Sequence, residues 1–299
     1  MKIIKRIPEP IAGVMLALVA LGNLIGQETA GRKLCGIVAL ILFLGLTTKI
    51  ISDLDSFKSK MKDPIIAAVM GTYPMAMIVG ATYIKPFVPF LAWVFWIGGL
   101  ILMACLMIYF CKSFIINNFG WPKVFPGWFI VYVGMVVASV TGKAFIPSLG
   151  RIIFWVGFIF YIILIPVVMY RVLVFKQAKP PLKPTRMIIA APGSLCLAGY
   201  LSIIDNKAAT FVIFLLILSQ VLYLFALTSL KNIKNFFPSF SAYTFPTVIT
   251  AMAMKMSAAF LENGTLMAIA RVEFWIAVVL CIYVLVAYCK AIFAKPNEA

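Results

Sequence analysis

The sequence predicts an all-α integral membrane protein in which ten transmembrane helices form five hairpins. Hydrophobic residues make up 64% of the 299 residues and charged residues 12%, and the mean hydropathy is +1.08. Soluble domains, in contrast, are about half apolar and a quarter charged. Ten apolar runs approach membrane-spanning length, and prolines begin alternate runs. Since the runs occupy nearly the whole chain, residues 1–299 are expected to form a single transmembrane domain.

The apolar runs fit the length of about 20 residues that a helix needs to cross a hydrocarbon core of about 30 Å. Their boundaries are 11–26, 33–51, 65–84, 88–111, 125–144, 150–173, 185–204, 208–229, 240–260 and 268–292. Glu9 precedes the first run and lies close to Arg6 in the sequence, so we expect it to pair with Arg6 or to be solvated at the interface.

Proline recurs with a regular period at the starts of the odd-numbered runs. The intervals are 54, 62, 58 and 54 residues between Pro10, Pro64, Pro126, Pro184 and Pro238. Proline suits the first turn of a helix because its missing amide hydrogen would have no partner there. Coincidence among 17 prolines is the alternative, but the near-constant period favours duplicated two-helix units.

The odd runs share a weak point in their interiors as well. Pro74, Pro192 and Pro246 follow their initial prolines by 10, 8 and 8 residues, and Gly134 follows Pro126 by 8. Broken helices are tolerated in hydrocarbon only where protein shields them or where they line a cavity. Most of the internal small and polar residues also lie in odd runs. We therefore expect the odd helices to form an inner pore ring and the even helices an outer ring.

The basic residues of this chain, whose net charge is +17, lie mainly on one predicted side of the membrane. The termini and alternate loops hold eighteen of the 26 Lys and Arg, the other loops hold seven, and Lys255 lies within a run. This bias predicts that both termini are cytoplasmic and that the protein is a multi-pass protein of the cell membrane. It also explains most of the positive charge, so nucleic-acid binding is not expected.

The sequence offers little for metal binding or catalysis. It has no histidine, and none of its six cysteines forms a C-x-x-C pair, so we expect neither a metal site nor a cofactor. It has no G-x-S-x-G motif and no paired intramembrane aspartates, so we do not expect an enzyme. Asp205, Glu262 and Glu273 are expected at the outer ends of helices, which disfavours proton coupling through a buried acid.

Five motifs connect the chain with a known family. Tyr243-Thr244-Phe245-Pro246-Thr247 resembles the aromatic-rich (W/Y)-x-F-P signature of the tellurite-resistance/dicarboxylate transporter family. Four other odd runs contain further similar stretches: Glu9-Pro10-Ile11-Ala12-Gly13-Val14, Tyr73-Pro74-Met75-Ala76, Pro126-Gly127-Trp128-Phe129 with Gly134, and Ala191-Pro192-Gly193-Ser194. Each motif alone is weak, but five in order at matching spacing are fairly specific.

The resemblance implies a ten-helix fold of five hairpins, usually a homotrimer with one pore per subunit. The relatives include malate carriers, sulfite exporters and plant guard-cell anion channels. Phe245 matches the gating phenylalanine of the family. One departure is that Ser241-Ala242-Tyr243 replaces the tryptophan pair that often precedes this phenylalanine, so the pore near the gate is expected to differ.

Individual residues then acquire expected roles, each with a plainer alternative. Phe245 is expected to gate the pore by excluding water, although it could instead pack in the core as one of 25 phenylalanines. Lys255 and Thr244 are the candidate anion contacts. The alternative for Lys255 is that it reaches the outer interface or pairs with Glu262, and it lies roughly 80° around the helix from Phe245, which does not place it squarely in the same lumen. The expected pore-shaping residues, whose alternative is ordinary kinking, are Pro74, Gly134, Pro192, Gly193 and Pro246.

The sequence therefore predicts transmembrane transport of a small anion through a central pore. The expected cargo is a C4-dicarboxylate such as malate, or an inorganic anion such as chloride, nitrate or sulfite, and the expected partners are this anion, the lipid bilayer and two further copies of the chain. The alternative is a ten-helix drug/metabolite exporter, which is built from two halves of opposite orientation. The repeat at two-helix intervals favours parallel hairpins over that arrangement.

Overall fold

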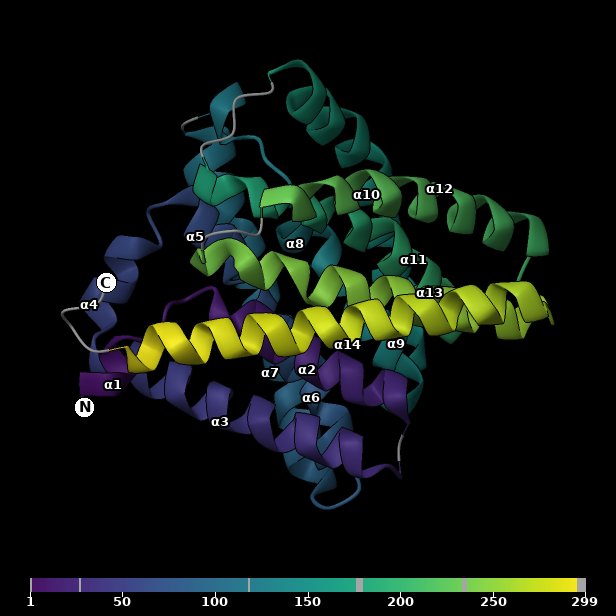
Figure 1. Ribbon diagram of the computed structural model, residues 1–299, viewed down its shortest axis with the longest axis horizontal. Helices are drawn as coiled ribbons and strands as arrows, with labels where there is room; N and C mark the ends of the chain where they lie inside the picture. Colours follow the sequence, from purple (N-terminus) through teal and green to yellow (C-terminus); the bar gives the residue numbers. More distant parts are fainter. Residues whose placement is uncertain (1, 27, 118, 176–179, 233–235, 295–299) are drawn as a thin grey trace.

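The computed structural model describes residues 2–26, 28–117, 119–175, 180–232 and 236–294, and these form a bundle of helices (Figure 1). The described residues contain no strand, which confirms the predicted all-α class. Seven helices are long and apolar enough to cross a membrane, and Ile11–Ile25 and Trp128–Ala144 are shorter apolar helices. The chain is thus a membrane protein with several spanning helices.

Five segments of the chain contact one another in a closed ring, and we call them the ring segments. Contacts join α2 to α6, α6 to α9, α9 to α11, α11 to α13, and α13 back to α2. The segments are α2 (Ile11–Ile25); α5 (Pro64–Val69) with α6 (Thr72–Ile84); α8 (Trp128–Val133), η3 (Gly134–Val136), α9 (Val137–Thr141) and η4 (Gly142–Ala144); η5 (Pro180–Ile189) with α11 (Ala190–Ile203); and η7 (Pro238–Tyr243) with α13 (Phe245–Phe260).

Five longer helices lie outside the ring segments, and we call them the peripheral helices. They are α3 (Ala30–Ser52), α7 (Pro89–Phe110), α10 (Pro147–Val174), α12 (Ala209–Leu227) and α14 (Gly264–Phe293). Each packs against the ring segment that precedes it in the chain. Burial separates the two groups: α2 buries 13 of its 15 residues, whereas α3 buries two of its 23.

Shorter helices lie in the connections: α1 (Lys2–Lys5), α4 (Leu54–Lys60), the π-helical η1 (Cys111–Ile116), and the 3-10 helices η2 (Trp121–Lys123) and η6 (Thr228–Asn232). The short helices α1 and α4 and the last turns of α14 lie at the same end of the molecule, which we call the terminal end (Figure 1). The opposite end is called the far end.

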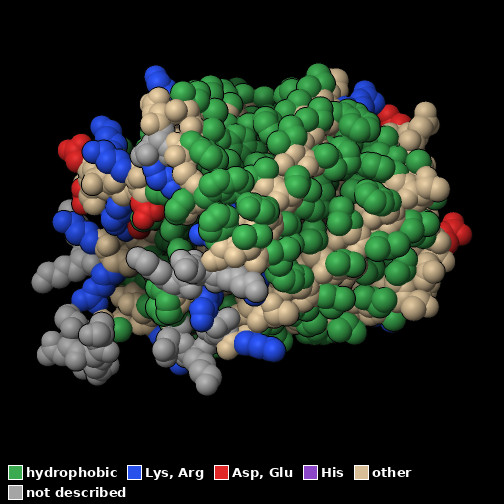
Figure 2. Space-filling model, turned by 90° about the horizontal axis from the view of Figure 1, so that it is seen from above, with side chains coloured by type: hydrophobic (Ala, Val, Ile, Leu, Met, Phe, Trp, Pro, Cys, Tyr) green, Lys and Arg blue, Asp and Glu red, His purple; other side chains and the backbone are tan. Residues whose placement is uncertain are grey.

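The outer surface of the bundle is apolar over its middle. Large exposed side chains on the peripheral helices include Leu34, Ile41, Leu224, Trp275 and Val279. Hydrophobic side chains cover most of the face seen in Figure 2, while Lys and Arg gather at one end of it. This pattern is typical of helices in contact with lipid, with charges at the interfaces.

The ring segments are interrupted close to the predicted weak points. α5 ends at Val69 and α6 begins at Thr72, so Pro74 is the third residue of the second piece. Pro192 is likewise the third residue of α11, Pro246 the second of α13, and Gly134 begins the 3-10 turn η3. Proline lacks an amide hydrogen and its ring clashes with the carbonyl four residues earlier. The interruptions therefore fall just before the prolines.

The position expected for Glu273 at an outer helix end is wrong. α14 begins at Gly264 rather than at the predicted residue 268, so Glu273 is the tenth residue of the helix. Its exposed fraction is 4%. A carboxyl group therefore lies within the apolar part of the bundle, in a peripheral helix.

The expected pairing of Glu9 with Arg6 is also wrong. Glu9 Oε1 accepts hydrogen bonds from Lys49 Nζ and Lys60 Nζ, each at 2.8 Å, whereas Arg6 Nη1 donates to the Ala294 carbonyl at 2.7 Å. The sequence separation hid these partners, because Lys49 lies at the end of α3 and Lys60 at the end of α4. Glu9 therefore ties the start of α2 to two later elements.

The two lysines change the pKa of Glu9. Burial alone would raise the pKa, but the hydrogen bonds from Lys49 and Lys60 outweigh it, so the pKa of Glu9 lies below its ordinary value. The hydrogen bond to Glu9 is also the main reason why the pKa of Lys60 is raised. Because the folded pKa of Glu9 is lower than the unfolded one, its contribution to stability is present above the unfolded pKa and is lost as pH falls through the folded pKa.

Replacement of Glu9 by Gln should destabilise the folded protein at neutral pH by about 1–3 kcal/mol, because it removes the negative charge that accepts hydrogen bonds from two partly buried ammonium groups. The measurement is the apparent melting temperature in detergent at neutral and at acidic pH. The difference between Glu9→Gln and the unmodified chain should shrink in acid. Asp55→Asn is the control, because Asp55 is fully exposed and lies 3.9 Å from Lys58. A melting temperature of Glu9→Gln equal to that of the unmodified chain would contradict the assignment.

Candidate functional site

Three cavities lie along the ring segments. The first, the far cavity, has a volume of about 750 Å³ and is lined by residues late in the ring segments, among them Leu24, Lys143 and Lys255. The second, the terminal-end cavity, has about 340 Å³ and is lined by residues at the starts of ring segments, among them Pro64 and Pro126. The third, the narrow cavity, has about 40 Å³.

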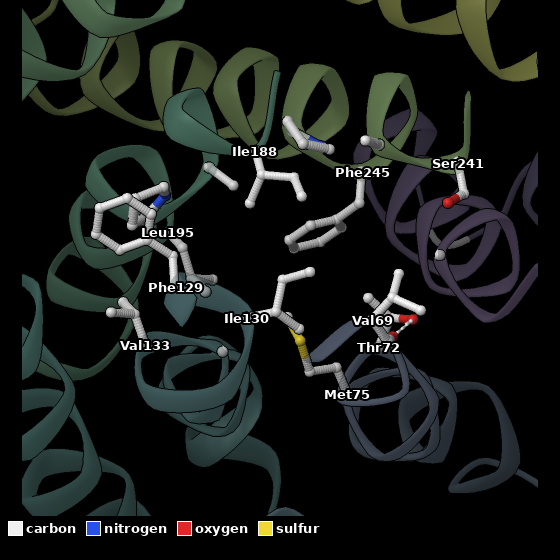
Figure 3. Close-up of a pocket in the computed structure, with 16 residues that line it drawn as sticks. Val69, Thr72, Met75, Phe129, Ile130, Val133, Ile188, Leu195, Ser241 and Phe245 are labelled. Atoms are coloured by element: carbon white, nitrogen blue, oxygen red, sulfur yellow. Dashed lines mark hydrogen bonds between the residues drawn. The ribbon is translucent and has the colours of Figure 1, made fainter. Parts of the chain in front are cut away.

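Phe245 separates the narrow cavity from the far cavity. Its side chain lines both of them, and its exposed fraction is only 6%. Figure 3 shows the ring projecting into the narrow cavity between Ile130 and Ile188. Leu195 on α11 also lines both cavities. The boundary between the two cavities is therefore apolar and includes an aromatic ring.

The first turn of α13 positions Phe245. The backbone of Thr244 departs from the helix at φ −91° and ψ −77°, and Phe245 and Pro246 begin the helix. Proline at this point requires no amide partner, which suits a helix that starts inside the protein. The Thr247 hydroxyl lies 3.1 Å from the Tyr243 carbonyl and can donate to this backbone acceptor just before the helix. The interruption before α13 thus directs the Phe245 side chain into the narrow cavity.

The five predicted pore-shaping residues fall into two groups. Gly134, Pro192 and Pro246 line the narrow cavity. Pro74 and Gly193 line none of the three cavities. They face peripheral helices instead: a Cβ added at Gly99 of α7 would lie 2.9 Å from the Pro74 carbonyl oxygen, and one added at Gly193 would lie 2.8 Å from the Tyr161 hydroxyl of α10.

Thr244 is fully buried and lines none of the cavities described. Its hydroxyl lies 2.7 Å from the Ser241 carbonyl and 3.3 Å from the Gly13 carbonyl, so it can donate to either. A Cβ added at Gly13 would lie 3.1 Å from the Ser241 Cβ. In this arrangement the Thr244 hydroxyl joins α13 to α2, where the ring of segments closes. The contact of Thr244 with an anion stays a prediction.

Lys255 lines the far cavity, as Phe245 does. From the sequence, Lys255 lies roughly 80° around the helix from Phe245, but the far cavity is wide enough for both residues to line it. Lys255 Nζ donates to the Leu24 carbonyl at 3.0 Å, and no ion pair with Glu262 occurs among the described residues. The ammonium group is thus held by a neutral acceptor at the cavity wall.

Three further cationic side chains line the far cavity. They are Arg32, Lys85 and Lys143. Arg32 Nε donates to Asn23 Oδ1 at 3.2 Å and its Nη2 to the Thr82 carbonyl at 3.2 Å, while the guanidinium lies 4.2 Å from the centre of the Tyr83 ring. Lys85 Nζ donates to the Ala144 carbonyl. Neutral groups thus position these two side chains, so the bonds described here do not cancel their charge.

The terminal-end cavity is cationic as well. Its lining includes Lys123, Arg171, Lys183 and Arg186. Arg171 Nε donates to the Trp121 carbonyl at 2.9 Å, and the Arg186 guanidinium lies 5.4 Å from the centre of the Phe225 ring. No Asp or Glu is found among the described residues that line any of the three cavities.

From the sequence, these basic residues predicted only the orientation of the chain, and their place in the cavity walls was not predicted. The available signal was their position: Arg32, Lys85 and Lys143 come at or just after the ends of ring segments, and Lys183 and Arg186 come at the start of one. Residues at the ends of the ring segments surround the two openings of the ring, the far cavity and the terminal-end cavity, which we call its mouths. Recognising this from the sequence would require knowing that the five segments close into a ring.

The cavities follow one another along common faces of the ring segments. In α5 and α6, Ile65 lines the terminal-end cavity, whereas Val69 and Thr72 line the narrow cavity. Ile65 and Val69 are four apart in α5 and lie on one face of it; in α6, Met75 lines the narrow cavity and Val79 and Thr82 line the far cavity, again four and three apart. The two mouths and the constriction therefore lie in series along the ring.

Comparison with known proteins agrees with this architecture. The sequence profile described as voltage-dependent anion channel matches residues 11–289. Two proteins of Methanocaldococcus jannaschii, each named an uncharacterized transporter, are each 25% identical to the chain, over 168 and 172 residues. These matches cover 50% and 51% of this chain and 48% of each relative, so the chain spans about half the length of the curated relatives that it matches.

The profile match covers four of the five sequence motifs and the first from Ile11 onward, and it extends into the last peripheral helix. It confirms the family resemblance drawn from those motifs. With a helical ring whose two mouths are lined by cations, the structure is consistent with the chemistry that the family description names. The chain belongs to the voltage-dependent anion channel family.

Proposed function

We propose that this protein conducts small anions passively through the ring, with Phe245 as the gate. The charge of the two wide cavities carries the proposal: four Lys or Arg line each of them, and no Asp or Glu does so among the described residues. A cavity lined by charges of one sign raises the local concentration of the opposite ion. Cations are repelled at both mouths for the same reason.

The narrow cavity supports a gate rather than a binding site. Its volume of about 40 Å³ is small beside the volumes of about 340 and 750 Å³ of the other two cavities. An ion there loses most of its hydration shell, and an apolar constriction of this kind closes by excluding water. Rotation of the Phe245 side chain would open it, while Gly134, Pro192 and Pro246 shape the surrounding wall.

The proposed cargo follows from the contrast between the apolar narrow cavity and the two cationic cavities. An apolar constriction favours anions that lose water readily, such as nitrate and chloride, and the cationic mouths also suit sulfite or a C4-dicarboxylate such as malate. Lys255 is the proposed anion contact in the far cavity, and Thr244 the proposed contact beside the gate. Free passage through one gate requires no coupling ion.

For the whole assembly, we propose ten crossings in five hairpins, with the ring segments inside and the peripheral helices outside. The closed set of contacts from α2 to α13 supports this arrangement over two inverted halves. The basic terminal end supports cytoplasmic termini in the cell membrane. Family resemblance supports a homotrimer with one pore in each subunit.

Phe245→Ala is the direct test. Removal of the ring should raise anion flux into proteoliposomes at least about tenfold, which corresponds to about 1.4 kcal/mol of barrier. Flux of chloride, nitrate, sulfite and malate is measured separately at matched protein amounts. Phe214→Ala is the control, because Phe214 is exposed on α12 and should leave flux unchanged. Equal flux with and without the Phe245 ring would contradict the gate, and cation flux without anion flux would overturn the proposed function.

The position of the barrier has a separate test, made in a background without the six native cysteines. A membrane-impermeant thiol reagent added at the far end should label Met256→Cys, which lines the far cavity, but not Val69→Cys, which lines the narrow cavity. Adding Phe245→Ala should make Val69→Cys reactive, as measured by the mass shift of the protein. Labelling of Val69→Cys at the same rate with Phe245 intact would place the barrier elsewhere.

Lys255→Gln tests the cationic far mouth. Loss of one of its four positive charges should lower anion flux about threefold at low ionic strength, and the difference should shrink at high salt because exposed charges are screened. Lys58→Gln is the matched control, since Lys58 is exposed and lies near Asp55 rather than in a cavity. Unchanged flux and unchanged salt dependence in Lys255→Gln would exclude a role for this charge.

A further inference from the structure

Glu273 is a buried acid that the proposed pathway does not use. It lies on α14 and lines none of the cavities described. Its exposed fraction is 4%, whereas those of its neighbours Val272 and Trp275 are 61% and 64%. The helix therefore presents Val272 and Trp275 outward and turns the carboxyl group into the protein.

Two polar side chains of α12 accompany this carboxyl group. The Gln220 side chain faces Glu273, and Tyr223 is buried beside it. Glu273 Oε2, Gln220 Nε2 and the Tyr223 hydroxyl each lack a hydrogen-bond partner among the described residues. Two peripheral helices thus share a buried polar cluster that the surrounding protein does not satisfy.

No cation on the neighbouring elements neutralises Glu273. The elements packed against α14 are α13, α2 and η7. The titratable residue of α13 is Lys255, whose Nζ is bonded to the Leu24 carbonyl; η7 has Tyr243, whose hydroxyl donates to the Ser229 carbonyl; α2 has none. On α12 the titratable residue is Tyr223, and on α14 itself the nearest, Arg271, is exposed.

Chemistry favours the neutral carboxyl group in this place. An ionised carboxylate in an apolar interior is costly unless it is paired. A carboxylic acid has one donor and one acceptor, and the amide of Gln220 offers the complementary acceptor and donor. A small side-chain adjustment would let Gln220 donate to the carboxyl group; this bond favours the charged form, but it does not offset the cost of an unpaired charge in an apolar interior.

We propose that Glu273 is a proton-binding site inside the membrane, occupied in the arrangement described here, and that release of its proton to water raises anion flux. α14 packs along α13, and α13 begins with Phe245. An ionised Glu273 would draw water or a cationic partner and so disturb the packing of α14 along α13. The effect on flux rests on the proposed anion conduction, whereas proton binding does not.

Proton binding is measured by infrared spectroscopy of the purified full chain over a range of pH. A protonated-carboxyl band should titrate in the unmodified protein and should be missing in Glu273→Gln. Gln220→Met provides a second variant: loss of the amide donor, which stabilises the charged form, should move the midpoint of the band to higher pH. Absence of a band attributable to Glu273, or an unchanged midpoint in Gln220→Met, would overturn the site.

Coupling is measured as anion flux in proteoliposomes at mildly acidic and mildly alkaline pH. Flux of the unmodified chain should rise about fivefold with pH, and Glu273→Gln, which mimics the protonated form, should stay at the low level throughout. Glu28→Gln is the matched control, because Glu28 is exposed and should keep the pH dependence. An identical pH profile in Glu273→Gln would overturn the coupling. Absence of anion flux in every variant would instead contradict the proposed function and leave the infrared result to decide the site.

Discussion

Backbone groups inside a membrane need hydrogen-bond partners, and this requirement governs how the ring segments are built. A helix interrupted before Phe245 or between Val69 and Thr72 shifts the backbone bonds there, so Tyr73 donates to Met70 rather than to Val69, and some carbonyls lose their usual helical partner. Such groups cannot face lipid. The peripheral helices cover the ring segments, and threonine hydroxyls reach carbonyls at the interruptions, as Thr72 does for Val69 and Thr247 for Tyr243. The breaks are stable because the outer layer is continuous helix.

The distribution of charge follows from the same layering. Peripheral helices expose apolar side chains to lipid, so cations can be accommodated only at the helix ends or in cavities between segments. Described contacts position three of these cations by carbonyl oxygens and an aromatic ring: Lys255 by Leu24, Lys85 by Ala144 and Arg186 by Phe225. A neutral anchor fixes the side chain and leaves its charge available to an anion.

Helix class and the division into inner and outer segments were predictable from the sequence because hydropathy and proline period are local properties. The direction in which each residue points was not, because it depends on how a helix is rotated against its neighbours. Thus Pro192 lines the narrow cavity, whereas its neighbour Gly193 packs against Tyr161. Glu273 was misplaced because the last helix begins four residues before the predicted boundary, and one turn of helix is enough to move a residue from the interface into the bundle.

The contact between α2 and α13 has a consequence for how the protein is made. Thr244 and Gly13 are separated by 231 residues. One side of α2, the first ring segment to be synthesised, therefore stays uncovered until α13, in the last ring segment, has been made. Contacts of such long range form late. Until then the interrupted segments have no complete shield, and the early hairpins depend on one another, on water or on the insertion machinery. Truncation anywhere before α13 would leave an open ring rather than a smaller pore.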